Sequence, residues 1–225
     1  MRKIARDWHS VRWSHRSKVF QRTPKNQRNF PNPTDVRRWA QANLAFNAEN
    51  KVMIAVAGAV APLVGLLQSG TAVCKQHAAG ALATLACNAD NKVAIVTAGA
   101  IAPLVELLRS GTAGGKDNAT VALATLACNN AANRVVIAAA GAVVPLIDLL
   151  RSGTDIGRKR AALALANLAC STDNLLAIVS AGAAVPLVEL LRSGTAHGKE
   201  MAAWMLANGP RHRFATLVRV AKNRT

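Results

Sequence analysis

Four nearly identical segments recur along this chain at an almost constant spacing. Each is 13 residues long, begins with Gly-Ala and ends with Ser-Gly. They start at Gly58, Gly99, Gly141 and Gly182, which gives a period of 41, 42 and 41 residues. A period of this length is typical of solenoids, in which similar units stack on one another. We therefore expect about four stacked units, with the one extra residue, after Cys128, in a polar loop where an insertion costs little.

Each unit is predicted to contain three helices, because residues that start and end helices recur at the same places. An asparagine is expected to cap a short first helix, and a glycine to close it in the left-handed conformation. A proline then falls in the first turn of a second helix, where its missing N–H costs nothing. Ser-Gly ends that helix, and a longer third helix runs up to a Leu-Ala-Cys motif. The predicted caps are Asn50, Asn91, Asn133 and Asn174, the glycines are the four named above, and the prolines are Pro62, Pro103, Pro145 and Pro186.

Apolar residues within each unit are spaced as on one side of a helix. In the first unit the second helix carries Leu63, Leu66 and Leu67, and the third helix carries Leu82 and Leu85. Burying one leucine contributes about 1.5–3 kcal/mol, and a lone three-helix unit cannot cover such a stripe. Stacking is therefore obligatory. The isoleucines expected to point inward from the first helices are Ile54, Ile95, Ile137 and Ile178.

The composition favours an all-α protein. The chain is 51% hydrophobic but only 4% aromatic, and it contains no tyrosine. Its apolar residues are mainly Ala, Val, Leu and Ile, which suit closely stacked helices. A sandwich or barrel would need aromatic and β-branched residues in alternation.

The net charge of +17 is concentrated at the two ends of the chain. Residues 1–38 carry 11 Lys and Arg against 2 acidic residues, and residues 210–225 carry 5 against none. The segment between them carries 12 against 9. Binding of nucleic acid or acidic membrane therefore stays open as an alternative, through the basic tails alone. Residues 1–33, which include Trp8 and Trp13, are interpreted as a disordered, solubilising extension.

The chain carries no pattern typical of an enzyme, a metal site or a cofactor site. Cys87, Cys128 and Cys170 recur at repeat-like intervals without a CxxC or Cys/His spacing, so we expect small buried thiols in a reducing compartment. The segment Gly111–Lys116 lacks the spacing of a phosphate-binding loop. The five histidines are scattered. We therefore expect no catalytic residue, no metal and no cofactor.

A membrane span is also not expected. Val52–Cys74 is uncharged and long enough to cross a bilayer. The equivalent segments downstream, however, contain charged residues such as Glu106 and Arg109, which a lipid-facing helix tolerates only at high cost.

The repeated blocks resemble armadillo repeats, of the kind found in plant, algal and vacuolar adaptor proteins. The resemblance rests on the blocks GAVAPLVGLLQSG, GAIAPLVELLRSG, GAVVPLIDLLRSG and GAAVPLVELLRSG and on the Leu-Ala-Cys-Asn endings. It implies a right-handed α-solenoid whose third helices line a concave groove that binds extended peptides. The predicted organisation is a basic extension (1–33), an armadillo domain (34–208) and a basic tail (209–225), the domain comprising a leading third helix (34–47) and units 48–88, 89–130, 131–171 and 172–208.

The same resemblance implies a set of peptide-binding residues. In peptide-carrying armadillo proteins the third helix presents a tryptophan and, four residues later, an asparagine that clamps the peptide backbone. An amide can pair with both backbone groups, whereas a threonine bonds only singly. The middle units carry Gly80, Val121 and Leu163 at the tryptophan position. The residues expected to bind a peptide are Trp39, Asn43, Thr84, Thr125, Asn167, Trp204 and Asn208.

Two further columns of polar residues follow the third helices. The first lies eight residues before the asparagine column, on the same face, and its signs are mixed, so it does not form an acidic slot for basic peptides. Its members, beyond Asp35, are the candidate groove charges Gln76, Asp117, Lys159 and Glu200. The second column is interpreted as a solvated edge, with a basic ridge for acidic partners as the alternative. It contains Lys75, Lys116, Arg158 and Lys199.

These observations predict a scaffold or adaptor that binds a protein or peptide, in the cytoplasm or the nucleus. Two alternatives stay open, an adaptor for basic nuclear-localisation peptides and the substrate-binding part of a ubiquitin ligase. Self-association is a further expectation, because Pro210 should stop the last third helix before a capping repeat forms. The apolar residues expected to lie uncovered at that end are Leu187, Leu190, Leu191, Met201 and Leu206.

Overall fold

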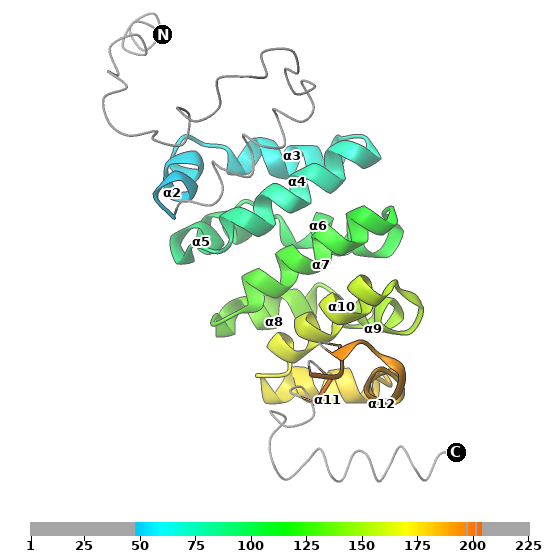
Figure 1. Ribbon diagram of the computed structural model, residues 1–225. Helices are drawn as coiled ribbons and strands as arrows, with labels where there is room; N and C mark the ends of the chain where they lie inside the picture. The colour runs from blue at the N-terminus through cyan, green and yellow to red at the C-terminus, as the bar shows by residue number, and fades with distance from the viewer. Residues whose placement is uncertain (1–47, 197, 201, 204–225) are drawn as a thin grey trace, which may run out of the picture. The chain divides into compact units, whose positions relative to one another are not determined.

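The computed structural model describes residues 48–196, 198–200 and 202–203, which all belong to the unit Asn43–Thr225. Every regular element within them is an α-helix, so the all-α prediction is confirmed. The helices follow the predicted order of two short helices and one longer helix per unit (Figure 1). The first unit contains α2 (Ala48–Val56), α3 (Val60–Ser69) and α4 (Ala72–Leu85). The later units contain α5 (Ala89–Thr97), α6 (Ile101–Ser110) and α7 (Ala113–Ala127), then α8 (Ala131–Ala139), α9 (Val143–Ser152) and α10 (Asp155–Leu168), then α11 (Thr172–Ser180) and α12 (Ala184–Ser193).

A glycine forms the corner between the first and second helices of each unit. At Gly99 φ is +79°, and the N–H groups of Gly99 and Ala100 donate to the carbonyls of Val96 and Ile95, at 2.9 and 3.3 Å. This bonding pattern closes the helix end and turns the chain, and α5 and α6 meet at 81°. The predicted left-handed glycines are therefore confirmed, with φ between +79° and +84° at all four positions.

The predicted first-helix caps were wrong by one turn. The side chains of Asn88 and Asn130 cap α5 and α8, each accepting a bond of 3.0 Å from the N–H three residues later. Ser171 occupies the cap position of α11, and Asn50 lies inside α2. The sequence allowed both registers, because asparagine occurs at the cap and three residues after it.

The asparagines inside the first turn tie each unit to the one before it. Asn91 Nδ2 donates to Lys51 O at 3.0 Å and to Leu85 O at 3.2 Å. Asn174 Nδ2 makes the equivalent bonds to Arg134 O at 3.1 Å and Leu168 O at 3.3 Å. The third asparagine, Asn133, donates to Leu126 O at 3.0 Å. All three side chains are buried, so these bonds lie inside the stack.

The core runs continuously through the stacked units. The third helices α4, α7 and α10 pack side by side, and each packs against the second helix of its own unit (Figure 1). The inward isoleucines Ile95, Ile137 and Ile178 are completely buried, as predicted, whereas Ile54 is half-buried. Leu66 is 41% exposed, so the apolar stripe of α3 consists of its neighbours Val60, Val64 and Leu67.

Two other expectations about burial were wrong. Cys87 and Cys170 are exposed and Cys128 is half-buried, because each follows the last buried turn of a third helix. At the C-terminal end, Leu187 and Leu190 are buried, and a methyl group at Gly198 would lie only 3.1 Å from Leu190 Cδ1. The first turn of the third helix in the fourth unit therefore already covers part of the apolar surface at this end. Met201, Leu206 and Pro210 lie outside the described residues.

The extra residue after Cys128 lies in a loop, as predicted. Asn129, between α7 and α8, has φ +53°.

No single described helix is long and apolar enough to cross a membrane. Four bent pairs, each formed by a first and a second helix of one unit, meet the requirements of length and composition only when the two helices are taken together.

Replacing a corner glycine tests its conformation. Neither Gly99 nor Gly65, which lies inside α3, has any atom within 4 Å of an added Cβ, so the two differ in backbone conformation alone. We expect Gly99→Ala to lower the free energy of unfolding by about 1–2 kcal/mol. Gly65→Ala should raise it by about 0.5–1 kcal/mol. Urea denaturation measures both changes, and a Gly99→Ala variant as stable as the parent would contradict the argument.

Removing an inter-unit amide tests the stacking bonds. Asn174→Ala deletes two buried bonds, each worth about 0.5–1.5 kcal/mol, so we expect a loss of about 1–3 kcal/mol. Thr172→Ala, at an exposed position on the same helix, is the control and should change stability by less than about 0.5 kcal/mol. Equal effects of the two substitutions would count against the proposed role of Asn174.

Candidate functional site

The third helices present one partly exposed face, which we call the third-helix surface. On each helix three positions spaced four residues apart lie on this face, while most of the alanines and leucines between them are buried. The surface therefore combines two of the predicted columns with the tryptophan-equivalent positions between them. Its members are Gln76, Gly80 and Thr84 on α4, Asp117, Val121 and Thr125 on α7, and Lys159, Leu163 and Asn167 on α10.

The two threonines on this surface use their hydroxyl hydrogens internally. Thr84 Oγ1 donates to Gly80 O at 3.0 Å, and Thr125 Oγ1 donates to Val121 O at 2.8 Å. A hydroxyl has one hydrogen and two lone pairs. Each threonine can therefore still accept a hydrogen bond from a ligand N–H, but it cannot donate one without breaking its helix contact.

Asn167 is held in place by the neighbouring third helix. Its Nδ2 donates to Ala124 O on α7 at 3.0 Å. A primary amide has two N–H donors and one acceptor oxygen, so one N–H and the Oδ1 remain for a ligand. Asn167 can therefore bond both backbone groups of a peptide, with its amide already oriented.

Sequence reasoning missed a second contact between third helices. Asn118 Nδ2 donates to Gln76 O at 2.9 Å, and a methyl group at Gly80 would lie 3.1 Å from that nitrogen. The glycine thus leaves room for Asn118 to reach across to α4. Asn118 and Arg160 occupy equivalent positions, and a comparison of the repeats is the only sequence signal that could have pointed to them.

Of the two charged members of this surface, Asp117 is paired and Lys159 is not. Asp117 Oδ2 lies 3.2 Å from Arg160 Nη1, and the Asp117 side chain is only 22% exposed. Arg158 pairs with Asp155 of its own helix. Lys159, between the two arginines, is half-buried and joins no ion pair within the described part of the chain.

The remaining predicted site residues fall largely outside the described structure. Trp39, Asn43, Trp204, Asn208 and Asp35 lie in segments that the structure does not describe. Glu200 is described and exposed, and it takes part in an interaction. The residues brought together are thus Thr84, Thr125 and Asn167 with Gln76, Asp117 and Lys159.

Comparisons with known proteins agree on one family. The family profile described as Armadillo/beta-catenin-like repeat matches residues 47–87 and 88–128. Among solved structures, one chain described as a computationally designed armadillo repeat protein for modular peptide recognition is 30% identical in sequence to this chain. Its TM-score is 0.71, and the match covers 79% of this chain and 77% of that one. The chain belongs to the armadillo repeat family.

Other armadillo structures are similar over most of this chain. A designed armadillo repeat protein in complex with the peptide (KR)4 is 28% identical, with a TM-score of 0.76 over 86% of this chain and 84% of that one. A further engineered protein is 33% identical, with a TM-score of 0.71 over 79% and 76% of the two chains. No curated protein matches the sequence. The armadillo fold typically serves as a non-enzymatic binding scaffold.

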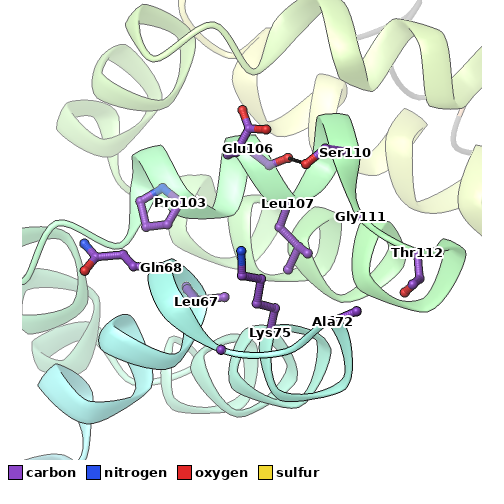
Figure 2. A pocket seen from close by; sticks show the side chains of 11 residues that line it. Leu67, Gln68, Ala72, Lys75, Pro103, Glu106, Leu107, Ser110, Gly111 and Thr112 are labelled. Carbon is purple, nitrogen blue, oxygen red and sulfur yellow. Dashed lines mark hydrogen bonds between the residues drawn. The ribbon is translucent and has the colours of Figure 1, made fainter.

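Away from the third-helix surface, this armadillo protein has a cavity of about 290 Å³ between its first and second units. Figure 2 shows Lys75 extending into it between Leu67 and Leu107, with Glu106 on the opposite helix. Gln68 lines the same cavity. Lys75 is half-buried, so the expectation that the second polar column is a solvated edge does not hold for this residue.

The cavity lies where one inter-unit bond is missing. In the second and third units an arginine at the position of Gln68 bonds the next corner glycine. Arg109 Nη2 donates to Gly141 O, and Arg151 Nη2 to Gly182 O, each at 3.3 Å. Gln68 forms no such bond within the described residues.

Among all the residues that the structure describes, no group of three or more His, Cys, Asp or Glu side chains could hold a metal ion.

The pairing of Asp117 with Arg160 can be measured directly. We expect a double-mutant cycle of Asp117→Ala and Arg160→Ala to give a coupling of about 0.5–1 kcal/mol, because the pair is partly screened by solvent. The control is the cycle on Asp148 and Arg151, which are 3.8 Å apart and at least half exposed. Its coupling should be smaller, near zero. Equal coupling in the two cycles would show that Asp117 is no better neutralised than a surface carboxylate.

Proposed function

We propose that this armadillo protein is a non-enzymatic scaffold that binds an extended segment of another protein across its third-helix surface. The observation that carries the proposal is the row formed by Thr84, Thr125 and Asn167. Each lies at the same position of successive third helices, and each keeps unused hydrogen-bonding capacity toward solvent. An extended backbone carries unpaired N–H and C=O groups that such a row can bond.

The spacing of this row suits an extended chain. Packed helices lie roughly 8–10 Å apart, and an extended chain advances about 3.3 Å per residue. About every third residue of a bound segment would therefore meet a residue of the row. Similar designed armadillo proteins support the proposal, since one is in complex with a peptide and others were made for modular peptide recognition.

The finer assignments rest on sequence alone. An adaptor for basic nuclear-localisation peptides is favoured by the Trp39/Asn43 and Trp204/Asn208 pairs, whereas the middle units lack the tryptophan. The substrate-binding part of a ubiquitin ligase has no specific residue in its favour. We propose a cytoplasmic or nuclear location, with the four free cysteines consistent with a reducing compartment. Binding of nucleic acid or acidic membrane is proposed only for the basic tails.

A peptide library tests the proposed function. We expect peptides selected on the full chain to lose at least about tenfold in affinity when Thr84→Val, Thr125→Val and Asn167→Leu are combined, because backbone bonds worth about 0.5–1.5 kcal/mol each are removed. A matched triple variant on the second helices, Glu106→Gln, Asp148→Asn and Glu189→Gln, should bind as the parent does. Affinities come from calorimetry, and circular dichroism checks the fold. Selected peptides that bind both variants equally would refute the proposal.

A further inference from the structure

The one charge left unpaired on the described third-helix surface, that of Lys159, indicates which segment it binds. We propose that its ligand is an extended segment with apolar side chains and at least one carboxylate, and that polybasic segments are rejected. This inference rests on the proposed function and adds the chemistry of the ligand to it.

The acidic residue in the middle of the surface is not available to a basic ligand. Both oxygens of Asp117 face α10. Oδ2 lies 3.2 Å from Arg160 Nη1, and Oδ1 lies 3.2 Å from the place where a Cβ on Gly157 would stand. A ligand lysine would have to displace Arg160 to reach this carboxylate. The mixed signs of the column therefore do not provide a site for a cation at Asp117.

The cation beside it is available. Arg158 and Arg160 flank Lys159 and are held by Asp155 and Asp117, so Lys159 is the member of this run that joins no ion pair in the described structure. The equivalent residue of the fourth unit, Glu200, takes part in an interaction of its own. A carboxylate is therefore the ligand group that best matches Lys159.

Uncovered apolar side chains surround Lys159. Ile156 is 58% exposed and Leu163 is 39% exposed, and they lie three residues before and four residues after Lys159 on the same face of α10. Val121 on α7 is half-buried beside them in the tryptophan-equivalent column. Apolar ligand side chains that cover these residues would remove hydrocarbon from water, which a chain of lysines and arginines does poorly.

Three synthetic peptides test this chemistry. The peptide LSDSLSDSL presents leucine and aspartate on one side of an extended chain, because alternate side chains share a face. The peptide LSKSLSKSL differs only in the sign of its charge, and (KR)4 is polybasic. We expect LSDSLSDSL to bind the full chain at least about tenfold more tightly than either of the others in 0.15 M salt.

Two charge reversals separate the surface from the basic tails, which attract any acidic peptide. Lys159→Glu should weaken LSDSLSDSL about fivefold and strengthen LSKSLSKSL, as expected when attraction in a partly exposed pair is replaced by repulsion. Lys116→Glu makes the same change of net charge one column away on α7 and should alter either affinity less than twofold. Biolayer interferometry on immobilised peptides measures all the combinations.

The outcomes distinguish this inference from the function on which it rests. Tighter binding of LSKSLSKSL or (KR)4, or equal effects of Lys159→Glu and Lys116→Glu, overturns the inference. Library peptides that depend on Thr84, Thr125 and Asn167 but carry no carboxylate also overturn it, while the proposed function stands. Library peptides that ignore those three residues overturn both.

Discussion

Each unit depends on its neighbour to bond the carbonyls at the end of its third helix. Those carbonyls lack the N–H groups of a following helical turn. Here the buried amides of Asn91, Asn133 and Asn174 donate to them, and each comes from the next unit. Two of the same amides also reach the first helix of the preceding unit. Because bonding and apolar burial are completed by the same step of stacking, the fold is held by contacts between nearest neighbours rather than by one central core.

Stacking of this kind also creates the candidate site. Thr84, Thr125 and Asn167 are far apart in sequence, and only the fixed register of the units places them in one row. That register is kept by bonds that cross between third helices, from Asn118 to Gln76 O and from Asn167 to Ala124 O. The residues that would contact a ligand are thus positioned by the same amide chemistry that holds the units together.

Local features of the fold could be predicted from the sequence, whereas contacts between units could not. The corner at Gly99 and the proline-containing second helix at Pro103 depend on residues within one turn, so their sequence signals were sufficient. The role of Asn91 could not be predicted, because its partner Lys51 lies 40 residues away. The exposure of Cys87 and Leu66 depends on where the neighbouring unit stops covering the helix. The pairing of Asp117 with Arg160 likewise joins two units, and these two residues lie 43 positions apart in the sequence.

That last pairing decides how the surface charge is read. In sequence, the column Gln76, Asp117, Lys159 and Glu200 has mixed signs, with two acidic members and one basic member. In the structure the carboxylate of Asp117 is already neutralised by Arg160, which lies one position outside the column. The charge that a ligand meets is therefore the remainder after pairing, and at the centre of the described surface this remainder is Lys159. Two armadillo proteins with the same fold can therefore prefer ligands of opposite charge, because a change in one such pair alters which charge is left exposed.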